Sequence, residues 1–374
     1  MENFVIPRRF VRIKALQNLY AYTITEQAHK QEVIEQVKKD FIFDKFFNEP
    51  AEKQHLANAQ SLAVALCYEA ITKQLPSELI AYQENKKIEQ SVRKHLGHYM
   101  ATLRQDQTFL QNGFNQAKES IYIDLLYTLL LLLAWYKLAK AEHDSCKPGN
   151  LKKQLSQDPL LEELYNHNKW IKAIYKNEIS WAKHQDKVLN WYSAFIQSAE
   201  MPQTYVSDAN SSVNFLDCIV QDIILKESPI NDFLAMRDLY WDEHKRIVKK
   251  ILTQIFRMLS TKDFAGFTLF WQNLERNWTI EAAFYNRLCT IVIQNNSVYE
   301  AMIGQKSEKW DSERILLTDK LILKLALAEL LECKEIPCKV SINEYIEIAK
   351  WYGTTKSGAF VNGVLEGILK GINR

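Results

Sequence analysis

Three arginines near the amino terminus are the strongest candidates for binding chemistry in this sequence. Arg8, Arg9 and Arg12 lie within about one helical turn, Lys14 follows, and residues 3–25 hold no acidic side chain. Guanidinium groups bind phosphate oxygens through paired hydrogen bonds, and a helix start offers backbone N–H groups to the same anions. The segment therefore predicts contacts with a nucleic-acid backbone, and a merely solubilising basic end is the alternative.

The helix that would carry these arginines has a clear apolar side. Pro7 suits the first helical position, and an apolar stripe follows at helical spacing, formed by Val11, Ala15, Leu16, Leu19 and Tyr22. Cations in a first turn oppose the helix dipole at a cost of about 0.3–1 kcal/mol each, so stability does not explain them. We expect the arginines to project past the edge of the core.

Other catalytic or ligand-binding patterns are missing from the sequence. It contains no glycine-rich phosphate loop and no Gly-x-Ser-x-Gly turn. His95 and His98 fit one helix face, but no carboxylate or cysteine stands at a useful spacing for a metal. The prediction is a protein without catalytic residues, metal or cofactor.

The composition indicates which elements position the arginines. Only 10 Gly and 8 Pro occur in 374 residues, too few for the frequent turns of a β-sandwich or barrel, and apolar residues recur at helical spacing. The most apolar run, Leu125–Tyr136, is shorter than the ~20 residues that span a bilayer. We expect an all-α protein with this run as a buried core helix, no membrane association, no secretory signal and a cytoplasmic location.

The last part of the chain is basic and rich in glycine. Five of the ten glycines fall within the last 22 residues, and Gly363, Gly367 and Gly371 recur every four residues. Side-chain-free positions on one helix face let another backbone come close. We expect a neighbouring helix to pack there, with the arginine-bearing first helix as a candidate, so that both basic termini form one surface.

Helix starts can also be located in this part. Thr318 or Asp319 is placed to cap one helix, and Ser357 can cap the last. Between them, residues 341–344 (Ser-Ile-Asn-Glu) have the pattern of a capping box. The sequence therefore predicts three helices after residue 317.

Tryptophans mark the middle of the chain. Trp181, Trp241 and Trp310 each open an amphipathic segment. They suggest a repeated helix-turn-helix unit, and chance placement among nine tryptophans is the alternative.

These residues resemble a known family. The stretch 336–350, followed by 360–365, is similar to the C-terminal signature of the NusB family of transcription antitermination factors, and 8–20 resembles the first helix of that family. The resemblance implies an all-helical, NusB-like bundle with a large helical insertion. We expect a first basic helix at 1–40, an enlarged helical middle with the tryptophan-headed repeats at 41–305, and the signature region at 306–374.

The resemblance also implies partners and site residues. It implies a non-enzymatic factor that binds boxA-like single-stranded RNA together with the ribosomal protein NusE, within the RNA polymerase antitermination complex. Tyr20 and Asp319 match positions at the NusE surface. The expected RNA-binding residues are Arg8, Arg9, Arg12, Lys14, Tyr20, Lys356 and Phe360.

The sequence departs from the family pattern at three positions. Phe10 stands where a further arginine is common, and Ile13 and Lys356 replace acidic residues. Phe10 lowers the expected number of phosphate contacts, and Lys356 offsets this by adding a cation.

Two other functions are compatible with parts of the sequence. One is a helical scaffold whose enlarged middle recruits a protein partner. The other is a ribosomal RNA methyltransferase, which would need a cofactor-binding α/β domain after residue 374.

Overall fold

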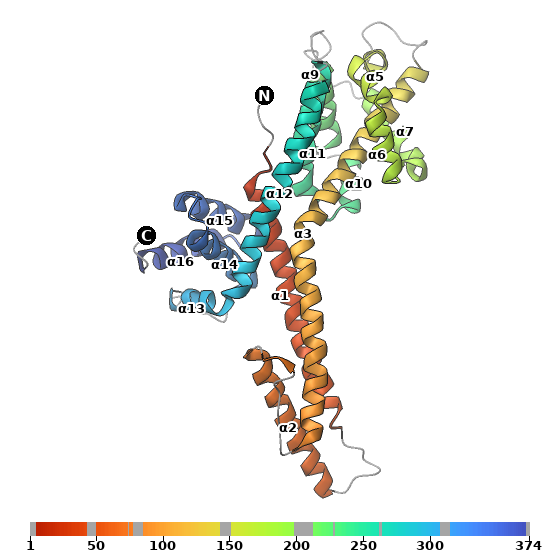
Figure 1. Ribbon diagram of the computed structural model, residues 1–374. Coiled ribbons are helices and arrows are strands. Elements are labelled where there is room, and N and C mark those ends of the chain that lie inside the picture. The colour runs from red at the N-terminus through yellow and green to blue at the C-terminus, as the bar shows by residue number, and fades with distance from the viewer. Residues whose placement is uncertain are drawn as a thin grey trace. The chain divides into compact units, whose positions relative to one another are not determined.

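The computed structural model describes residues 5–42, 50–73, 75–77, 85–142, 151–197, 212–226, 229–261, 264–306 and 315–371. Throughout these ranges every regular element is a helix (Figure 1), which confirms the all-α prediction. The chain divides into two compact units. Unit 1 comprises Met1–Phe10 and Asn115–Ala282, and unit 2 comprises Val11–Phe114 and Ala283–Arg374.

Three long helices pass from one unit into the other. They are α1 (Arg8–Lys39), α3 (Lys86–Ala141) and α12 (Phe264–Gln294), and each unit boundary falls inside one of them. The expected division at residues 40 and 305 stays a prediction.

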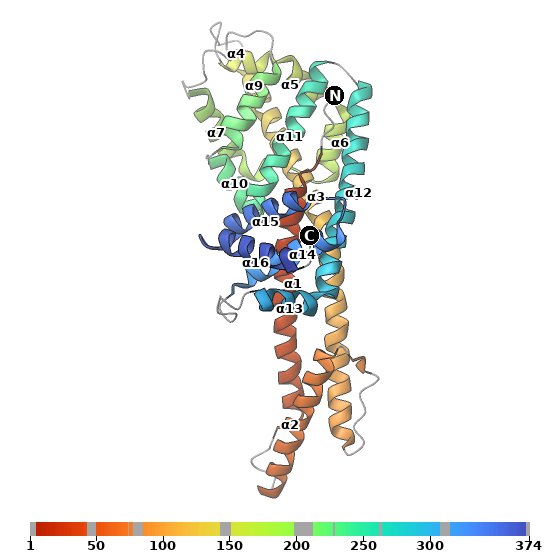
Figure 2. The same cartoon turned by 90° about the vertical axis from the view of Figure 1, so that its left-hand side faces the viewer.

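In unit 2, α2 (Pro50–Thr72) lies beside the last turns of α1 and the first turns of α3 (Figures 1 and 2). Their facing sides share one hydrophobic cluster, since Val37 of α1, Ala63 and Cys67 of α2 and Val92 and Leu96 of α3 are all fully buried. Small side chains on α2 let the three helices approach closely.

The remaining helices of unit 2 form a second group. They are α13 (Asn296–Lys306), α14 (Leu317–Glu332), α15 (Cys338–Tyr352) and α16 (Ser357–Gly371), and they pack on one another (Figure 2). The central helix α14 is covered on all sides, because residues 321–328 are each at most 5% exposed. A helix buried all round sits at the centre of its group.

Unit 1 is built on the second half of α3 and on α11 (Trp241–Ser260). The amphipathic α11 buries Ile247, Val248, Ile251 and Leu252 at helical spacing. The other helices of this unit are α4 (Leu151–Ser156), α5 (Pro159–Asn166), α6 (Asn168–Lys176), the short 3₁₀ turn η3 (Ala182–His184), α7 (Gln185–Gln197), α9 (Ser212–Cys218), the π-helical η4 (Ile219–Ile224) and α10 (Pro229–Arg237).

The apolar run of α3 is core, as expected. Leu126, Leu131 and Trp135 are fully buried. Among the described residues, α3 is the one helix with the length and apolar composition to cross a bilayer, but 61% of its most apolar window is covered by the protein itself. This burial is what the core helix of a folded domain requires.

The tryptophan-headed repeat remains a prediction. Trp241 opens α11 and donates from Nε1 to Oδ1 of Asn231 at 2.9 Å, whereas Trp181, which precedes η3, donates to the carbonyl of Tyr127 at 3.3 Å. Trp310 lies outside the described residues.

Candidate nucleic-acid interface

The first residues of α1 present two arginines in unit 1. The side chain of Arg8 is 42% exposed, and its Nε lies 3.6 Å from Oε1 of Glu281 on α12. Arg9 is half-buried, and no acidic residue stands in the first turn of α1. Arg8 is therefore open to a second anion on its solvent side, whereas the Glu281 carboxylate, whose side chain is 5% exposed, keeps Arg8 as its nearby cation.

Phe10 follows the two arginines and is 5% exposed. Its ring meets the rings of His244 and Trp278 edge-on, at centroid distances of 5.8 Å and 6.4 Å. Such edge-to-face pairs add to the stabilisation from the area that they bury. Apolar packing within unit 1 thus accounts for a phenylalanine where the resemblance expects an arginine.

Arg12, one turn further along α1, belongs to unit 2 and is 2% exposed. Its Nε donates to Oε2 of Glu329 at 2.8 Å, and its Nη2 donates to Oε1 at 2.6 Å. Ser341 Oγ and Tyr345 Oη donate to the same carboxylate at 2.6 Å and 3.0 Å. We call these four side chains, of Arg12, Glu329, Ser341 and Tyr345, the Glu329 network.

The network keeps Arg12 charged and Tyr345 neutral. Burial acts to lower the pKa of Arg12, but the hydrogen bonds and charge of Glu329 outweigh it and raise that pKa. Burial raises the pKa of the Tyr345 phenol well above its ordinary value, with the Glu329 charge acting in the same direction. Tyr345 therefore remains a neutral donor.

The network corrects two expectations. Arg12 does not project past the core edge, because Glu329, in the last turn of α14 and 0% exposed, requires a buried cation. Ser341 does not cap a helix, because α15 begins at Cys338 with Pro337 at its N-cap, and the Ser341 hydroxyl serves Glu329 instead.

Lys14 is also buried, at 2% exposure. It lies on the same helix as Arg12, in unit 2. A phosphate could reach either side chain only after the surrounding residues move. Whether Arg12 and Lys14 contact RNA stays a prediction.

The two residues expected at the NusE surface differ in exposure. Tyr20 on α1 is 43% exposed. Asp319, in the first turn of α14, is 6% exposed and accepts a hydrogen bond from Ser357 Oγ on Oδ2 at 2.9 Å. Neither Thr318 nor Asp319 caps α14, whose N-cap residue is Leu316.

The second oxygen of Asp319 has a distinct environment. Its Oδ1 is buried and has no hydrogen-bond partner among the described residues. Burial raises the pKa of this carboxyl, and the hydrogen bond from Ser357 partly offsets the shift. An acceptor without a partner is costly to bury, which makes Asp319 a position where an external donor would be stabilising.

The two expected residues around the start of α16 also differ. Lys356 is exposed, whereas Phe360 is 6% exposed. Base stacking requires an open ring face, so stacking on Phe360 would require its side chain to move. Ser357, expected to cap α16, is its first residue and donates to Asp319 instead.

The glycines of α16 do not make the expected close packing. A methyl group added at Gly363 would meet nothing within 4 Å, and at Gly367 and Gly371 its nearest neighbours would be side-chain atoms of Lys306, 3.8–4.0 Å away. The first helix is therefore not packed against this face. The basic residue at this end of α16 is Lys370, which is exposed.

The close approach of helices occurs instead at Gly113 on α3. A methyl group there would clash with the Asn18 amide of α1 and lie 2.9 Å from the Tyr285 hydroxyl of α12. Asn18 Nδ2 donates to Tyr285 Oη at 2.8 Å, and Tyr285 donates to the carbonyl of Leu110 at 2.7 Å. Gly113 leaves the space for this bridge between three helices of unit 2.

Unit 1 contains a charged cluster of Asp124, Arg237, Asp238 and His244, in which Asp124 and His244 are fully buried. Arg237 Nη2 donates to Oδ1 of Asp124 at 2.5 Å, and His244 Nδ1 lies 2.5 Å from Oδ2 of Asp238. The ligand atoms of Asp124, Asp238 and His244 fall within 4.8 Å of one another, as in metal sites, but the Arg237 cation already faces Asp124. A metal ion would therefore have to compete with a cation that the protein itself supplies.

The pKa values of the two carboxyl groups in this cluster are shifted in opposite directions. Burial raises the pKa of Asp124 to about 8, and its hydrogen bond with Asp238 adds to the shift. Burial acts against ionisation of Asp238 too, but the hydrogen bonds from His244 and Asp124 lower its pKa below the usual range. The two shifts favour the protonated form of Asp124 and the ionised form of Asp238.

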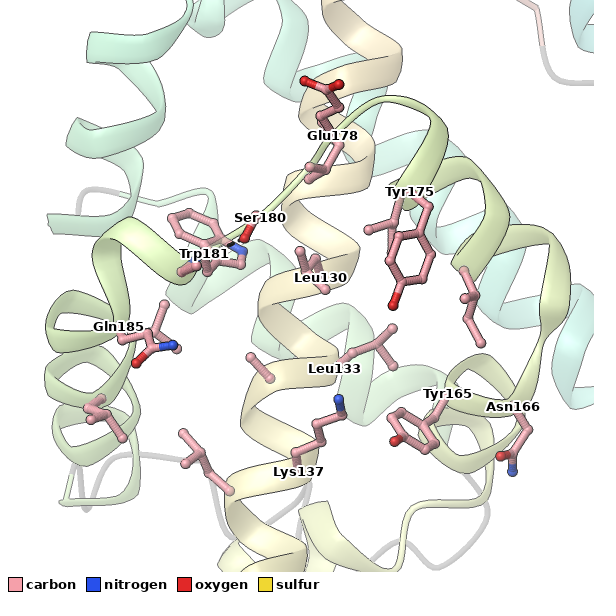
Figure 3. A pocket seen from close by; sticks show the side chains of 18 residues that line it. Leu130, Leu133, Lys137, Tyr165, Asn166, Tyr175, Glu178, Ser180, Trp181 and Gln185 are labelled. Carbon is pink, nitrogen blue, oxygen red and sulfur yellow. Dashed lines mark hydrogen bonds between the residues drawn. The ribbon is translucent and has the colours of Figure 1, made fainter.

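An apolar groove of about 1140 Å³ crosses unit 1 between α6 and α7 (Figure 3). Leu130, Ala134 and Leu138 of α3, spaced by four residues, form its floor. Glu178 and Lys137 stand at opposite ends in Figure 3. The walls carry exposed apolar side chains, namely Tyr165, Ile171, Tyr175 and Leu189.

Sequence reasoning did not identify Glu329 or Asp124, although a signal was present. Glu329 interrupts the apolar run 325–331, and Asp124 directly precedes the apolar run of α3. A carboxylate on a helix that is otherwise apolar must be paired when buried. The identity of the partners, more than 100 residues away in both cases, is not encoded locally.

Parts of this chain are similar to known proteins. The NusB family model matches residues 243–370. The transcription antitermination protein NusB of Thermodesulfovibrio yellowstonii is 38% identical over 102 residues, which are 27% of this chain and 68% of that protein. NusB of Agathobacter rectalis is 37% identical over 123 residues, which are 31% of this chain and 94% of that protein.

One solved structure, of Thermotoga maritima NusB, also matches. Its sequence is 40% identical, the match covers 27% of this chain and 75% of that chain, and the TM-score is 0.24. The family match contains Glu329, Ser341 and Tyr345 but not the arginines of α1.

Proposed function

Because the chain belongs to the NusB family of transcription antitermination factors, we propose that it binds boxA-type RNA together with NusE. It does so in the cytoplasm, within the antitermination complex of RNA polymerase that transcribes ribosomal RNA genes. The proposed role is that of a binding factor, which needs no catalytic residue and no cofactor.

The observation that carries this proposal is the placement of Arg8 and Arg9 at the start of a 32-residue helix with no acid in its first turn. Backbone N–H groups at a helix start and two guanidinium groups form an anion-binding site together. The side chain of Arg8 is 42% exposed, so its guanidinium can contact a phosphate on its solvent side while it stays near the buried carboxylate of Glu281. Further along the same helix, the ion pair of Arg12 with Glu329 anchors α1.

The test replaces both arginines. We expect Arg8→Ala with Arg9→Ala to weaken binding of a single-stranded boxA RNA in the presence of NusE. The slope of log K against log salt should become shallower by about 0.7 for each phosphate that is no longer neutralised. Fluorescence anisotropy across several salt concentrations measures both quantities.

A matched control uses the other end of the same helix. Lys38→Ala with Lys39→Ala removes the same charge from the last turn of α1. It should leave the salt slope unchanged. Equal slopes for the arginine variant and the wild type would contradict the proposal.

The NusE surface is proposed to include Tyr20 and Asp319. Tyr20 offers an exposed ring. Asp319 offers a buried carboxylate oxygen that lacks a hydrogen-bond donor among the described residues, and NusE would reach it once neighbouring side chains move. We expect Asp319→Asn, which keeps the size and removes the charge, to reduce co-purification with NusE while RNA binding by the isolated protein persists. Undiminished co-purification of both Asp319→Asn and Tyr20→Ala would exclude this surface.

The groove of unit 1 favours a second function, recruitment of a protein partner. The proposed occupant is an amphipathic helix whose apolar residues at i, i+4 and i+8 meet Leu130, Ala134 and Leu138. Glu178 at one end suits the positive start of a docked helix, and Lys137 at the other suits its negative end. Glu178 is held at φ 54, in the left-handed region that residues other than glycine rarely adopt.

This second function is tested with helical peptides selected for binding to the full-length protein. Selected peptides should carry the i, i+4, i+8 apolar pattern, and Leu189→Lys should abolish their binding. Leu239→Lys is the control, because Leu239 is 86% exposed and does not line the groove. Peptides without the pattern, or with equal affinity for both variants, would contradict it.

A further inference from the structure

A second cavity in unit 1 is walled by aromatic rings. It has a volume of about 690 Å³ and lies among α3, α6, α11 and α12. Trp170, Trp271, Trp278 and Tyr122 line it. A volume of this size is in the range of pockets for small planar ligands, and the family resemblance assigns no role to it.

Contacts between the aromatic side chains restrict their motion. The rings of Trp170 and Trp271 meet edge-on at a centroid distance of 5.7 Å. Trp170 and Trp278 are 4% and 5% exposed, whereas Trp271 is half-buried. Fixed indoles are a suitable platform for a flat ring, because little side-chain freedom remains to be lost on binding.

Polar groups in the lining are few and lie together. Lys118 Nζ contacts Oε2 of Glu275 at 2.5 Å, and Gln272 lies one helical turn before Glu275 on α12. Donors and acceptors therefore line the same cavity. Because Glu275 is already paired with Lys118, the cavity is better suited to a neutral ring with hydrogen-bonding edges than to a cation.

The cavity lies close to the proposed phosphate site. Trp278 meets the ring of Phe10 at 6.4 Å, and Glu281, three residues further along α12, lies 3.6 Å from Arg8. Residues three apart on a helix are neighbours on one face. The Arg8 guanidinium therefore stands about one helical turn from a wall of the cavity, and all these residues belong to unit 1.

We propose that this cavity takes one unstacked base of the single-stranded RNA whose phosphates bind Arg8 and Arg9. The inference rests on the proposed function. The half-buried indole of Trp271 stacks on the base, the buried Trp170 holds that indole in place, and Gln272 with the Lys118–Glu275 pair meets the hydrogen-bonding edge of the base.

The test measures RNA affinity by anisotropy with two kinds of variant. Trp271→Ala removes one wall, and Ala173→Trp fills the cavity without removing an aromatic residue. Each should weaken binding about 5- to 150-fold, the effect of one stacked base, while Trp271→Phe should weaken it less. RNA carrying 4-thiouridine at single positions should crosslink to the peptide that contains Trp271.

Controls separate this inference from the proposed function. Trp191→Ala, in the same unit but outside the cavity, should bind RNA like the wild type, and circular dichroism checks that each variant is folded. If Arg8→Ala with Arg9→Ala loses binding while folded Trp271→Ala and Ala173→Trp do not, the base site is overturned and the proposed function stands. If the wild-type protein with NusE does not bind RNA, both fall.

Discussion

Burial separates the basic side chains at the start of α1 into two groups. Arg8 is exposed and Arg9 half-buried, whereas Arg12 and Lys14 are each 2% exposed. The first pair can be reached by a ligand without unfolding. Arg12 is instead part of the Glu329 network, where its charge balances a carboxylate that is fully buried.

Removing Arg12 should therefore affect stability before it affects binding. Arg12→Ala leaves Glu329 buried without its cation, and we expect a loss of about 3–5 kcal/mol in the free energy of unfolding. Denaturant titration followed by circular dichroism measures it. Arg93→Ala is the control, because its ion pair with Glu89 lies at the surface, with side chains 43% and 24% exposed, and its change should stay within about 0.5 kcal/mol. A similarly small change for Arg12→Ala would contradict the role of the network.

Asp124 should make stability depend on pH. Burial and the hydrogen bond with Asp238 raise its pKa to about 8, so the folded state holds a proton that the unfolded state releases near pH 4. Stability should fall as the pH rises from 5 to 8, by at most about 1.4 kcal/mol per pH unit from this group.

The check compares unfolding curves at several pH values. Asp124→Asn imitates the protonated carboxyl and should flatten the dependence between pH 5 and 8. Asp242→Asn, whose parent side chain is 82% exposed, should retain it. Identical pH profiles for the wild type and Asp124→Asn would refute the assignment.

Among the helices, two glycines should respond in opposite ways to alanine. Gly363→Ala meets open space and should stabilise the protein by about 0.5–1 kcal/mol through helix propensity. Gly113→Ala clashes with the Asn18–Tyr285 bridge, and overpacking should outweigh propensity, for a net loss of about 1 kcal/mol. Thermal and denaturant unfolding measure both; stabilisation by Gly113→Ala would show that the bridge tolerates displacement.

Helix types were more predictable than helix starts. The apolar periodicity of α1 and α11 and the continuous apolar run of α14 are local properties, and so is the role of Pro159 and Pro229 as first helical residues. The start of α15 was not predictable, because the Ser341 hydroxyl can either cap a helix or donate a hydrogen bond to Glu329. A capping box is favoured locally, but a buried carboxylate twelve residues away requires the donor more.

At the scale of the whole molecule, the helices α1, α3 and α12 each contain residues of both units. Ending a helix at a unit boundary would leave backbone groups without partners, so the unfolding of one unit should spread to the other. Unit 1 holds seven of the nine tryptophans, which are Trp135, Trp170, Trp181, Trp191, Trp241, Trp271 and Trp278.

This distribution allows a test of cooperativity. Leu365→Ala creates a cavity in unit 2, where Leu365 is fully buried, at a cost of about 2–5 kcal/mol. The midpoint by tryptophan fluorescence, which reports mainly on unit 1, should fall together with the midpoint by circular dichroism. A fluorescence midpoint that does not move would show that the units unfold independently.

The all-α class, the buried run of α3 and the family could all be inferred from the chain alone, because helical periodicity, low glycine and proline content and a contiguous C-terminal motif are local properties. The exposure of each basic side chain could not be inferred from the sequence. Arg8 and Arg12 are the same residue type in the same basic segment. In the folded protein, however, Arg8 lies at an exposed helix start, whereas Arg12 is paired with Glu329, 317 residues away. Burial depends on such distant partners, and no local pattern specifies them.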